Sequence, residues 1–336
     1  MNNGISNGQA AWEYQGRITS CNGVFLEFGI KNRSLKAKVN IVPASPYLLV
    51  EKENYSTVKN SEGIDVVEWA KPIETKRAGK IFLPQLSGIY AASIFGCELV
   101  DMKQECKFCA APGYSGPKYS IENFIKEFEE LSKGQPIKEV TLNAGSVVSL
   151  PLRGYEILAP YVNALAERGV KSLNLEVMPP QDLKDAEGML GSMKDGGVTS
   201  VQFNIEIWND KKRRKVMPFK GLIPKESYLE SIAAGYKFLG AGKTSSVLLA
   251  GLNMIEELEN GSKSIIEAGG VPSVEIFRPI KGTLMQNFKP NIDYAGVTKL
   301  NKKIQEELEK RYGTDIYGTL EGCLKCGGCN EIMKIV

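Results

Sequence analysis

The chain has 336 residues, 43% of them hydrophobic and 24% charged, which fits a globular protein with one α/β barrel and small additions, or with two medium domains. A net charge of +3 is too small to predict binding to nucleic acid, and no apolar stretch is long enough to cross a membrane. The absence of histidine excludes histidine-ligated zinc or haem and catalysis by a histidine base.

The N-terminal segment lacks the basic start and apolar run of a secretion signal, so we expect a cytoplasmic protein. In a reducing compartment, grouped cysteines bind metals or iron–sulfur clusters more often than they form disulfides. Short extended pieces at 24–30, 37–42, 47–51 and 66–69 are separated by Gly, Asn, Pro and Ser. They predict a small β-rich unit within residues 1–80.

From residue 81 onward, strands alternate with amphipathic helices, which indicates βα units around a parallel sheet. Six strands are predicted at 89–95, 139–143, 172–177, 200–207, 245–249 and 274–278. Helices are predicted at 121–133, 154–168, 181–194, 225–239 and 293–312. The simplest closure is an α/β fold, a partial (β/α)6 barrel over residues 81–300, with its chemistry at the C-terminal ends of the strands. Residues 301–336 then form a helix and a cysteine-rich tail.

The first cysteine group consists of Cys97, Cys106 and Cys109, directly after the first predicted barrel strand. Its loop leaves the sheet at the edge where a barrel places its active site. A [4Fe-4S] cluster takes one ligand per iron, so three cysteines leave one iron open to another ligand. The alternatives are a zinc site with a distant fourth ligand and buried structural thiols.

The segment from Cys106 to Cys109 resembles the C-x-aromatic-C ending of the cluster motif in radical S-adenosylmethionine (SAM) enzymes. The resemblance is nearest to the biotin synthase type and covers about residues 96–285. It implies that the first cysteine group holds a [4Fe-4S] cluster whose open iron binds the amino and carboxylate groups of SAM, with Phe108 near the adenine. The spacing between Cys97 and Cys106 is longer than the family's commonest one.

Later strand ends match positions with which the family holds SAM. Asn143, Ala144 and Gly145 occupy the place of the Gly-Gly-Glu segment whose backbone binds the SAM amino group, although the glutamate is missing. Asn204 and Glu206 share one face of the fourth strand and resemble the Asn-Leu-Asp stretch of biotin synthase. The alternative is a hydrogen-bonded pair without a ligand. Further implied contacts are Glu176 on the third strand, a cation for the SAM carboxylate from among Arg213, Arg214 and Lys225, and Leu249 along the adenine.

The tail cysteines, Cys323, Cys326 and Cys329, form a second group near the end of the sequence. Their two-residue gaps and the intervening glycines let adjacent turns aim three sulfurs at one centre. We predict an auxiliary iron–sulfur cluster there, with structural zinc and free thiols as alternatives. Cys21 is the remaining cysteine that can complete a four-cysteine site, and a substrate or partner is the other source of a fourth ligand.

The resemblance implies an enzyme that reductively cleaves SAM to a 5′-deoxyadenosyl radical and abstracts hydrogen from an aliphatic carbon. A biotin-synthase-like barrel with a C-terminal cysteine group also looks like the two-protein lipoyl synthases of archaea, so sulfur insertion is the leading reaction. Radical dehydrogenation, rearrangement or methylation of a small metabolite or peptide are alternatives. A two-cluster electron carrier and a zinc-stabilised binding module are the alternatives of another class.

The implied partners are SAM, a small-molecule or acylated-protein substrate, an electron donor such as ferredoxin or flavodoxin, and a second radical SAM subunit. Sulfur insertion requires the substrate carbon to lie between SAM and the auxiliary cluster. We therefore expect the tail to fold back over the barrel opening.

Overall fold

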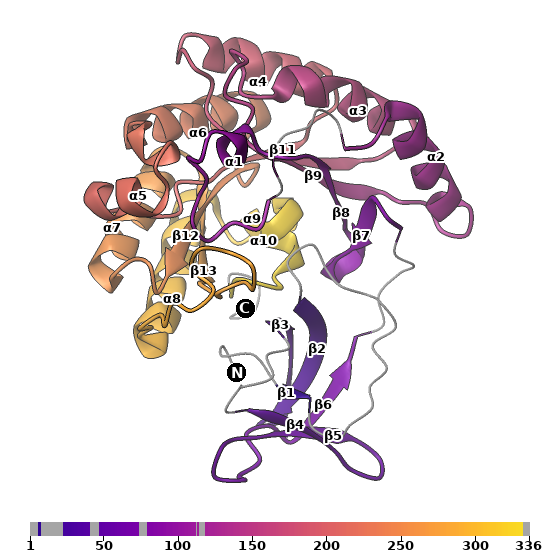
Figure 1. Ribbon diagram of the computed structural model, residues 1–336, viewed down its shortest axis with the longest axis vertical. Helices are drawn as coiled ribbons and strands as arrows, with labels where there is room; N and C mark the ends of the chain where they lie inside the picture. Colours follow the sequence, from indigo (N-terminus) through magenta and orange to yellow (C-terminus); the bar gives the residue numbers. More distant parts are fainter. Residues whose placement is uncertain are drawn as a thin grey trace.

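The computed structural model describes residues 6–7, 23–40, 47–73, 79–111, 113 and 118–331. Figure 1 shows a small N-terminal sheet beside a larger, curved sheet, with a layer of helices along the outer side of the curve. No helix of the described residues is long and apolar enough to cross a membrane. The mixed α/β architecture with a parallel sheet confirms the predicted fold class.

The N-terminal sheet has the order β1-β4-β5-β6-β2-β3. Its strands are β1 (Ser6–Asn7), β2 (Gly23–Ile30), β3 (Arg33–Asn40), β4 (Leu48–Glu51), β5 (Ser56–Lys59) and β6 (Trp69–Pro72). Leu26, Phe28 and Val58 belong to its core. The predicted pieces overlap β2, β3 and β4, whereas the piece at 66–69 overlaps β6 only at Trp69, and β5 was not predicted.

The larger sheet has the order β13-β12-β11-β10-β9-β8-β7. Its strands are β7 (Phe82–Pro84), β8 (Tyr90–Phe95), β9 (Glu139–Ala144), β10 (Ser172–Val177), β11 (Ser200–Phe203), β12 (Thr244–Ala250) and β13 (Val271–Ile276). Strands β8 to β13 run parallel, and β7 pairs antiparallel with β8. Because β7 and β13 are the edges of this sheet in the described part of the chain, the barrel is partial, as predicted.

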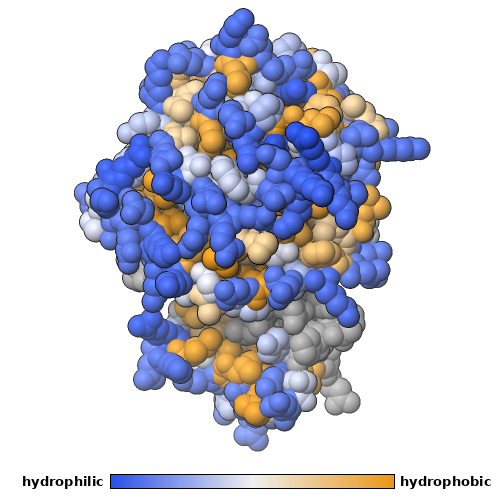
Figure 2. All heavy atoms as spheres, turned by 90° about the vertical axis from the view of Figure 1, so that its left-hand side faces the viewer, coloured by the Kyte–Doolittle hydropathy of each residue, from blue (hydrophilic) through white to orange (hydrophobic). Residues whose placement is uncertain are grey.

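The main helices are α2 (Ile121–Ser132), α3 (Tyr155–Glu167), α4 (Asp185–Asp195), α6 (Lys225–Leu239), α7 (Ile255–Glu267) and α8 (Tyr294–Tyr312). Figure 2 shows that the face on the left of Figure 1 is mostly hydrophilic, as expected where amphipathic helices turn their polar sides outward. Helix α7 was not predicted, because glycine and serine residues lower its helical propensity. A Cβ on Gly261 would lie 2.9 Å from Leu248 Cδ1, so this glycine lets α7 pack closely against β12.

Alternate side chains of each strand point to opposite faces of the larger sheet. In β10 the apolar side chains point to the helices and the polar ones point to the concave face. In β10, Leu173 and Leu175 belong to the main core, whereas Asn174 and Glu176 contact the C-terminal segment. That segment contains α9 (Ile316–Thr319) and α10 (Gly322–Cys326), and it lies on the inner side of the curved sheet in Figure 1.

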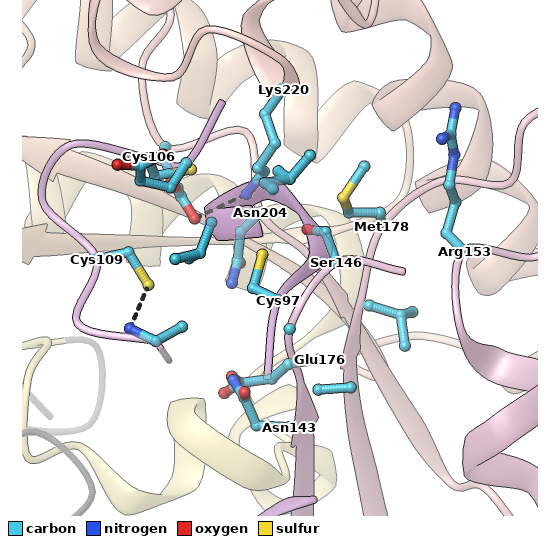
Figure 3. A pocket seen from close by; sticks show the side chains of 18 of the residues that line it. Cys97, Cys106, Cys109, Asn143, Ser146, Arg153, Glu176, Met178, Asn204 and Lys220 are labelled. Carbon is cyan, nitrogen blue, oxygen red and sulfur yellow. Dashed lines mark hydrogen bonds and ion pairs between the residues drawn. The ribbon is translucent and has the colours of Figure 1, made fainter. Parts of the chain in front are cut away.

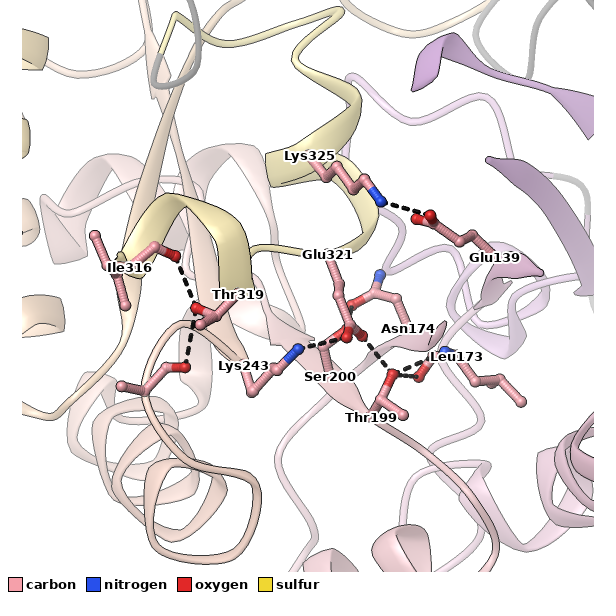
Figure 4. Close-up of polar contacts among 11 residues, drawn as sticks. Glu139, Leu173, Asn174, Thr199, Ser200, Lys243, Ile316, Thr319, Glu321 and Lys325 are labelled. Carbon is pink, nitrogen blue, oxygen red and sulfur yellow. Dashed lines mark hydrogen bonds and ion pairs between the residues drawn. The ribbon is translucent and has the colours of Figure 1, made fainter. Parts of the chain in front are cut away.

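The C-terminal segment enters the concave side from the N-terminal edge of the strands. Glu321 pairs with Lys243 and accepts a hydrogen bond from Thr199, each directly before a strand, and Lys325 pairs with Glu139 at the start of β9 (Figure 4). Gly322 has φ +56°, and a Cβ there would lie 2.5 Å from the side chain of Asn174. The tail therefore lies along the concave face. The expectation that it folds over the opening at the C-terminal edge is wrong.

Candidate active site

A pocket lies at the C-terminal ends of β8 to β11, which is the edge where the sequence predicted the chemistry (Figure 3). The predicted residues that line it are Cys97, Cys106, Phe108, Cys109, Asn143, Ala144, Gly145, Glu176, Asn204 and Glu206. Lining residues that sequence reasoning missed include Arg153, Met178 and Lys220. The pocket thus brings together residues from four strand ends that are far apart in the sequence.

The first cysteine group lies on one side of this pocket. Cys97 immediately precedes the short helix α1 (Glu98–Asp101), and Cys109 N–H donates to the Cys106 carbonyl at 2.9 Å. Burial raises the pKa of Cys106, Lys220 lowers it, and the nearby Glu206, Cys109 and Cys97 raise it further. All three cysteines line the pocket.

No three histidine, cysteine, aspartate or glutamate side chains among the described residues are gathered closely enough to hold a single metal ion. A four-iron cluster differs from a single ion because each cysteine binds its own iron at a separate corner. Three thiols that line one pocket are the donor set that such a cluster requires, with one corner left for another ligand.

The end of β9 packs directly against the backbone beside Cys97. A Cβ on Gly145 would lie 1.9 Å from the Gly96 carbonyl oxygen and 2.6 Å from the Cys97 Cα. Only glycine permits this approach, because any other residue would force one of the two segments to move. The contact holds the backbone from Asn143 to Ser146 beside the cysteine loop.

Glu206 and Lys220 form the charged pair of the pocket. Lys220 Nζ donates to Glu206 Oε1 at 3.0 Å, and both side chains are largely buried. Burial by itself would lower the pKa of Lys220, but the Glu206 carboxylate raises it above its usual value. Glu206 also has φ +65°, a strained conformation for a residue with a side chain.

The second carboxylate oxygen of Glu206 has an unmet hydrogen-bonding capacity. Oε2 is buried, and no partner for it exists among the described residues. Buried polar atoms normally have hydrogen-bond partners, so this oxygen is suited to a ligand hydroxyl or amino group. The neighbouring Asn204 accepts a hydrogen bond from Val247 N–H at 3.0 Å, which ties the pocket to β12.

The predicted cations Arg213, Arg214 and Lys225 do not line the pocket. Arg213 is buried beside Tyr228 and donates to the Ile223 carbonyl, whereas Arg214 is exposed. Lys225 donates to the Trp208 carbonyl at 3.1 Å.

Lys220 and Arg153 are the lysine and arginine that line the pocket. A tight approach at Gly221, where a Cβ would lie 2.6 Å from the Arg214 backbone, accompanies the inward position of Lys220.

An apolar wall adjoins the pocket. Phe108 makes an edge-to-face contact with Phe277, with 6.2 Å between ring centroids. Leu249 does not line the pocket itself but packs in the same apolar group, together with Ile207 and Met217. This wall is suited to the flat face of a ring.

The tail cysteines lie on the concave face, where Cys323 Sγ contacts Glu176 Oε1 at 3.2 Å. The other oxygen of Glu176 accepts a hydrogen bond from Asn143, so one carboxylate touches both a pocket residue and the tail. Burial raises the pKa of Cys323 well above its usual value, and Glu176, Glu275 and Cys326 raise it further. Cys21, the predicted fourth ligand, lies outside the described residues.

Comparison with known proteins finds a solved structure of similar fold over most of its length. No protein family model matches the chain. A radical SAM methyltransferase from Sphaerobacter thermophilus has a similar structure, with a TM-score of 0.50 and 11% sequence identity over 79% of this chain and 76% of that one. The two proteins share a fold.

Two further comparisons are more limited in extent. HydG, a maturase of the [FeFe]-hydrogenase, is similar to this chain with a TM-score of 0.49 and 15% identity, over 66% of this chain and 50% of HydG. Bacteriochlorophyllide c C-7(1)-hydroxylase of Chlorobaculum limnaeum is 26% identical over 143 residues, which are 41% of this chain and 35% of the hydroxylase. The chain thus spans about a third of that relative and half of HydG.

Proposed function

We propose that the chain is a radical SAM enzyme in which the first cysteine group holds a [4Fe-4S] cluster and SAM lies in the adjoining pocket. The observation that carries the proposal is that three cysteines share the pocket with the unpartnered Oε2 of Glu206. When bound, the cluster and SAM supply hydrogen abstraction from an unreactive carbon, while the protein supplies orientation and exclusion of water.

The residues of this chain would divide the binding of SAM among them. The backbone around Gly145 receives the amino group, Glu206 Oε2 accepts from a ribose hydroxyl, and Phe108 covers the adenine. Lys220 holds Glu206 in its strained conformation and supplies the positive charge of the pocket. Arg213, Arg214 and Lys225 would then not contact SAM. Arg213 and Lys225 would instead stabilise the backbone next to the site through their hydrogen bonds to carbonyl groups.

Anaerobic reconstitution tests this assignment. The Cys97→Ala, Cys106→Ala, Cys109→Ala triple variant should lose the iron of one cluster and form no 5′-deoxyadenosine from SAM under reducing conditions. The matched control replaces the three tail cysteines and should retain SAM cleavage. SAM cleavage at the wild-type rate by the first triple variant would refute the assignment.

We further propose that the tail cysteines hold an auxiliary iron–sulfur cluster that donates sulfur to the substrate. Glu176 supports this reading, because its carboxylate contacts both Asn143 in the pocket and Cys323 in the tail. For sulfur insertion, the substrate carbon would have to lie between the two sites, with hydrogen abstraction on one side and a cluster sulfide on the other. The proposed substrate is a small molecule or an acylated protein, with ferredoxin or flavodoxin as electron donor and a second radical SAM subunit as partner.

Methyl transfer and hydroxylation are the competing reactions, because they are named for the structural neighbour and the curated relative. Reconstitution with ³⁴S-sulfide separates the three outcomes by mass spectrometry of the product. A ³⁴S-labelled product supports sulfur insertion, whereas a methylated or hydroxylated product without label rejects it. Zinc in place of iron at the tail would reject the auxiliary cluster.

A further inference from the structure

The tail cysteines lie at a junction between the larger sheet and the N-terminal sheet. Arg278, two residues after β13, donates from Nη2 to Cys329 Sγ at 2.9 Å and from Nη1 to the Lys38 carbonyl at 3.1 Å. The Lys38 backbone N–H in turn donates to the Gly328 carbonyl at 3.0 Å. One arginine therefore connects a tail sulfur to strand β3.

Lys38 is a buried cation at this junction. The residue is 6% exposed, although lysine is rarely buried without a charged partner. Its ammonium lies 5.8 Å from the ring centre of Phe25, and a Cβ on Gly328 would lie 2.9 Å from the same ring. The tail thus rests directly on β2 and β3. Burial raises the pKa of the Cys326 thiol, and the positive charge of Lys38 lowers it.

Acidic groups lie near the first of the tail cysteines, and basic groups lie near the other two. Glu176 and Glu275 face Cys323 from β10 and β13, whereas Lys38 acts on Cys326 and Arg278 donates to Cys329. Hydrogen bonds to sulfur and the net charge nearby set the reduction potential of an iron–sulfur cluster. A buried cation stabilises the reduced cluster, which carries one more negative charge than the oxidised one.

We propose that Arg278 and Lys38 are positioning residues of the second centre, where Arg278 holds Cys329 as a ligand, the Lys38 backbone holds the tail at Gly328, and the two cations raise the midpoint potential of the cluster. The inference rests on the proposed auxiliary cluster. It makes the N-terminal sheet a part of that centre, since β3 supplies both a backbone contact and a charge.

The test uses the full chain with Cys97, Cys106 and Cys109 replaced by alanine, so that only the tail cluster contributes to the spectrum. Arg278→Gln removes the charge and keeps a donor, Arg278→Lys keeps the charge, and Lys38→Met removes the charge and keeps an apolar stem. Lys36→Met is the matched control, because Lys36 lies on the same strand but is exposed. Iron is counted first, and the midpoint potential is then measured by redox titration with electron paramagnetic resonance.

Arg278→Gln and Lys38→Met should both lower the midpoint potential, Arg278→Lys should restore part of the shift, and Lys36→Met should leave the potential unchanged. Loss of tail iron from a folded Arg278→Gln variant also supports the proposal, because it shows that Cys329 needs the arginine. Unchanged iron and potential in both Arg278→Gln and Lys38→Met overturn it. If the parent chain binds no iron at the tail, the auxiliary cluster itself fails and the inference with it, and the iron count distinguishes this result from an unchanged potential.

Discussion

The two cysteine groups end in the same two-residue spacing, yet the fold gives them different surroundings. The first group lies at the C-terminal edge of the larger sheet, and its Cys109 is exposed. The tail cysteines lie on the concave face, between β10 and the N-terminal sheet, with the partly buried Glu176 on one side and Arg278 on the other. Spacing thus indicates that sulfurs can converge, while the surrounding elements decide how accessible and how charged the centre is.

The two groups are also held by different forces. Backbone packing fixes the first, because Gly145 lies directly against the Cys97 backbone. Side-chain ion pairs fix the tail, since Glu321 and Lys325 bind the starts of strands in the larger sheet. A substitution at one group should therefore leave the other intact.

The largest effect is expected for Gly145→Val, which places side-chain atoms where the Gly96 carbonyl now lies. Overpacking of a tight contact costs about 1–3 kcal/mol and displaces backbone. We expect loss of SAM cleavage and of iron from the first site, with tail iron retained, by iron counting and product analysis. Gly134→Val is the control, because a Cβ on Gly134 would have nothing within 4 Å of it. Normal SAM cleavage by Gly145→Val would contradict the packing argument.

The next effect concerns the tail. Gly322→Ala adds a Cβ that would meet Asn174 at 2.5 Å and requires alanine to adopt φ +56°. We expect loss of tail iron and of substrate product, with 5′-deoxyadenosine formation retained. Gly318→Ala is the matched control in α9, since its Cβ would meet nothing within 4 Å. Tail iron at the wild-type level in Gly322→Ala would show that iron binding does not require the close contact between Gly322 and Asn174.

Much of the site could be predicted from local sequence. Strand ends, two-residue cysteine gaps and period-two alternation are local patterns, and they indicated the pocket residues from Cys97 to Glu206. Lys220 was not predicted, because its place in the pocket goes with a close approach of Gly221 to the Arg214 backbone that no local pattern encodes. Arg213, Arg214 and Lys225 were predicted in its place.

The surroundings of the tail could not be predicted in this way. Arg278 and Lys38 are 240 positions apart in sequence, and their contact arises only when the two sheets come together. The direction from which the tail enters the barrel likewise depends on the pairing of Glu321 with Lys243, 78 positions away. No periodic or spacing pattern encodes such contacts.

A smaller effect should distinguish ligand binding from cluster binding in the first site. Glu206→Gln keeps the shape of the side chain but removes its charge, and a charged hydrogen bond contributes about 1.5–3 kcal/mol, or roughly tenfold to a hundredfold in affinity. We expect weaker SAM binding by equilibrium dialysis, with the iron of the first site unchanged. Glu187→Gln, in an exposed ion pair, is the control. Equal SAM affinity in the two variants would make Glu206 a purely structural partner of Lys220.

The smallest effect concerns the carboxyl group of Glu275 on β13, close to the tail cysteines. Burial raises its pKa above the usual value, Arg278 and Lys38 lower it, Glu176 raises it, and a hydrogen bond from Ser273 lowers it. Because the folded-state pKa lies above the unfolded one, the folded protein binds more protons over that interval, and its free energy of unfolding falls as the pH rises from the unfolded pKa through the folded pKa. Glu275→Gln removes this ionisation, so the variant should gain stability relative to wild type at neutral pH and little near pH 4. Thermal unfolding of the cluster-free proteins across this range measures the difference, and a gain that is the same at both ends would mean that packing, not ionisation, is responsible.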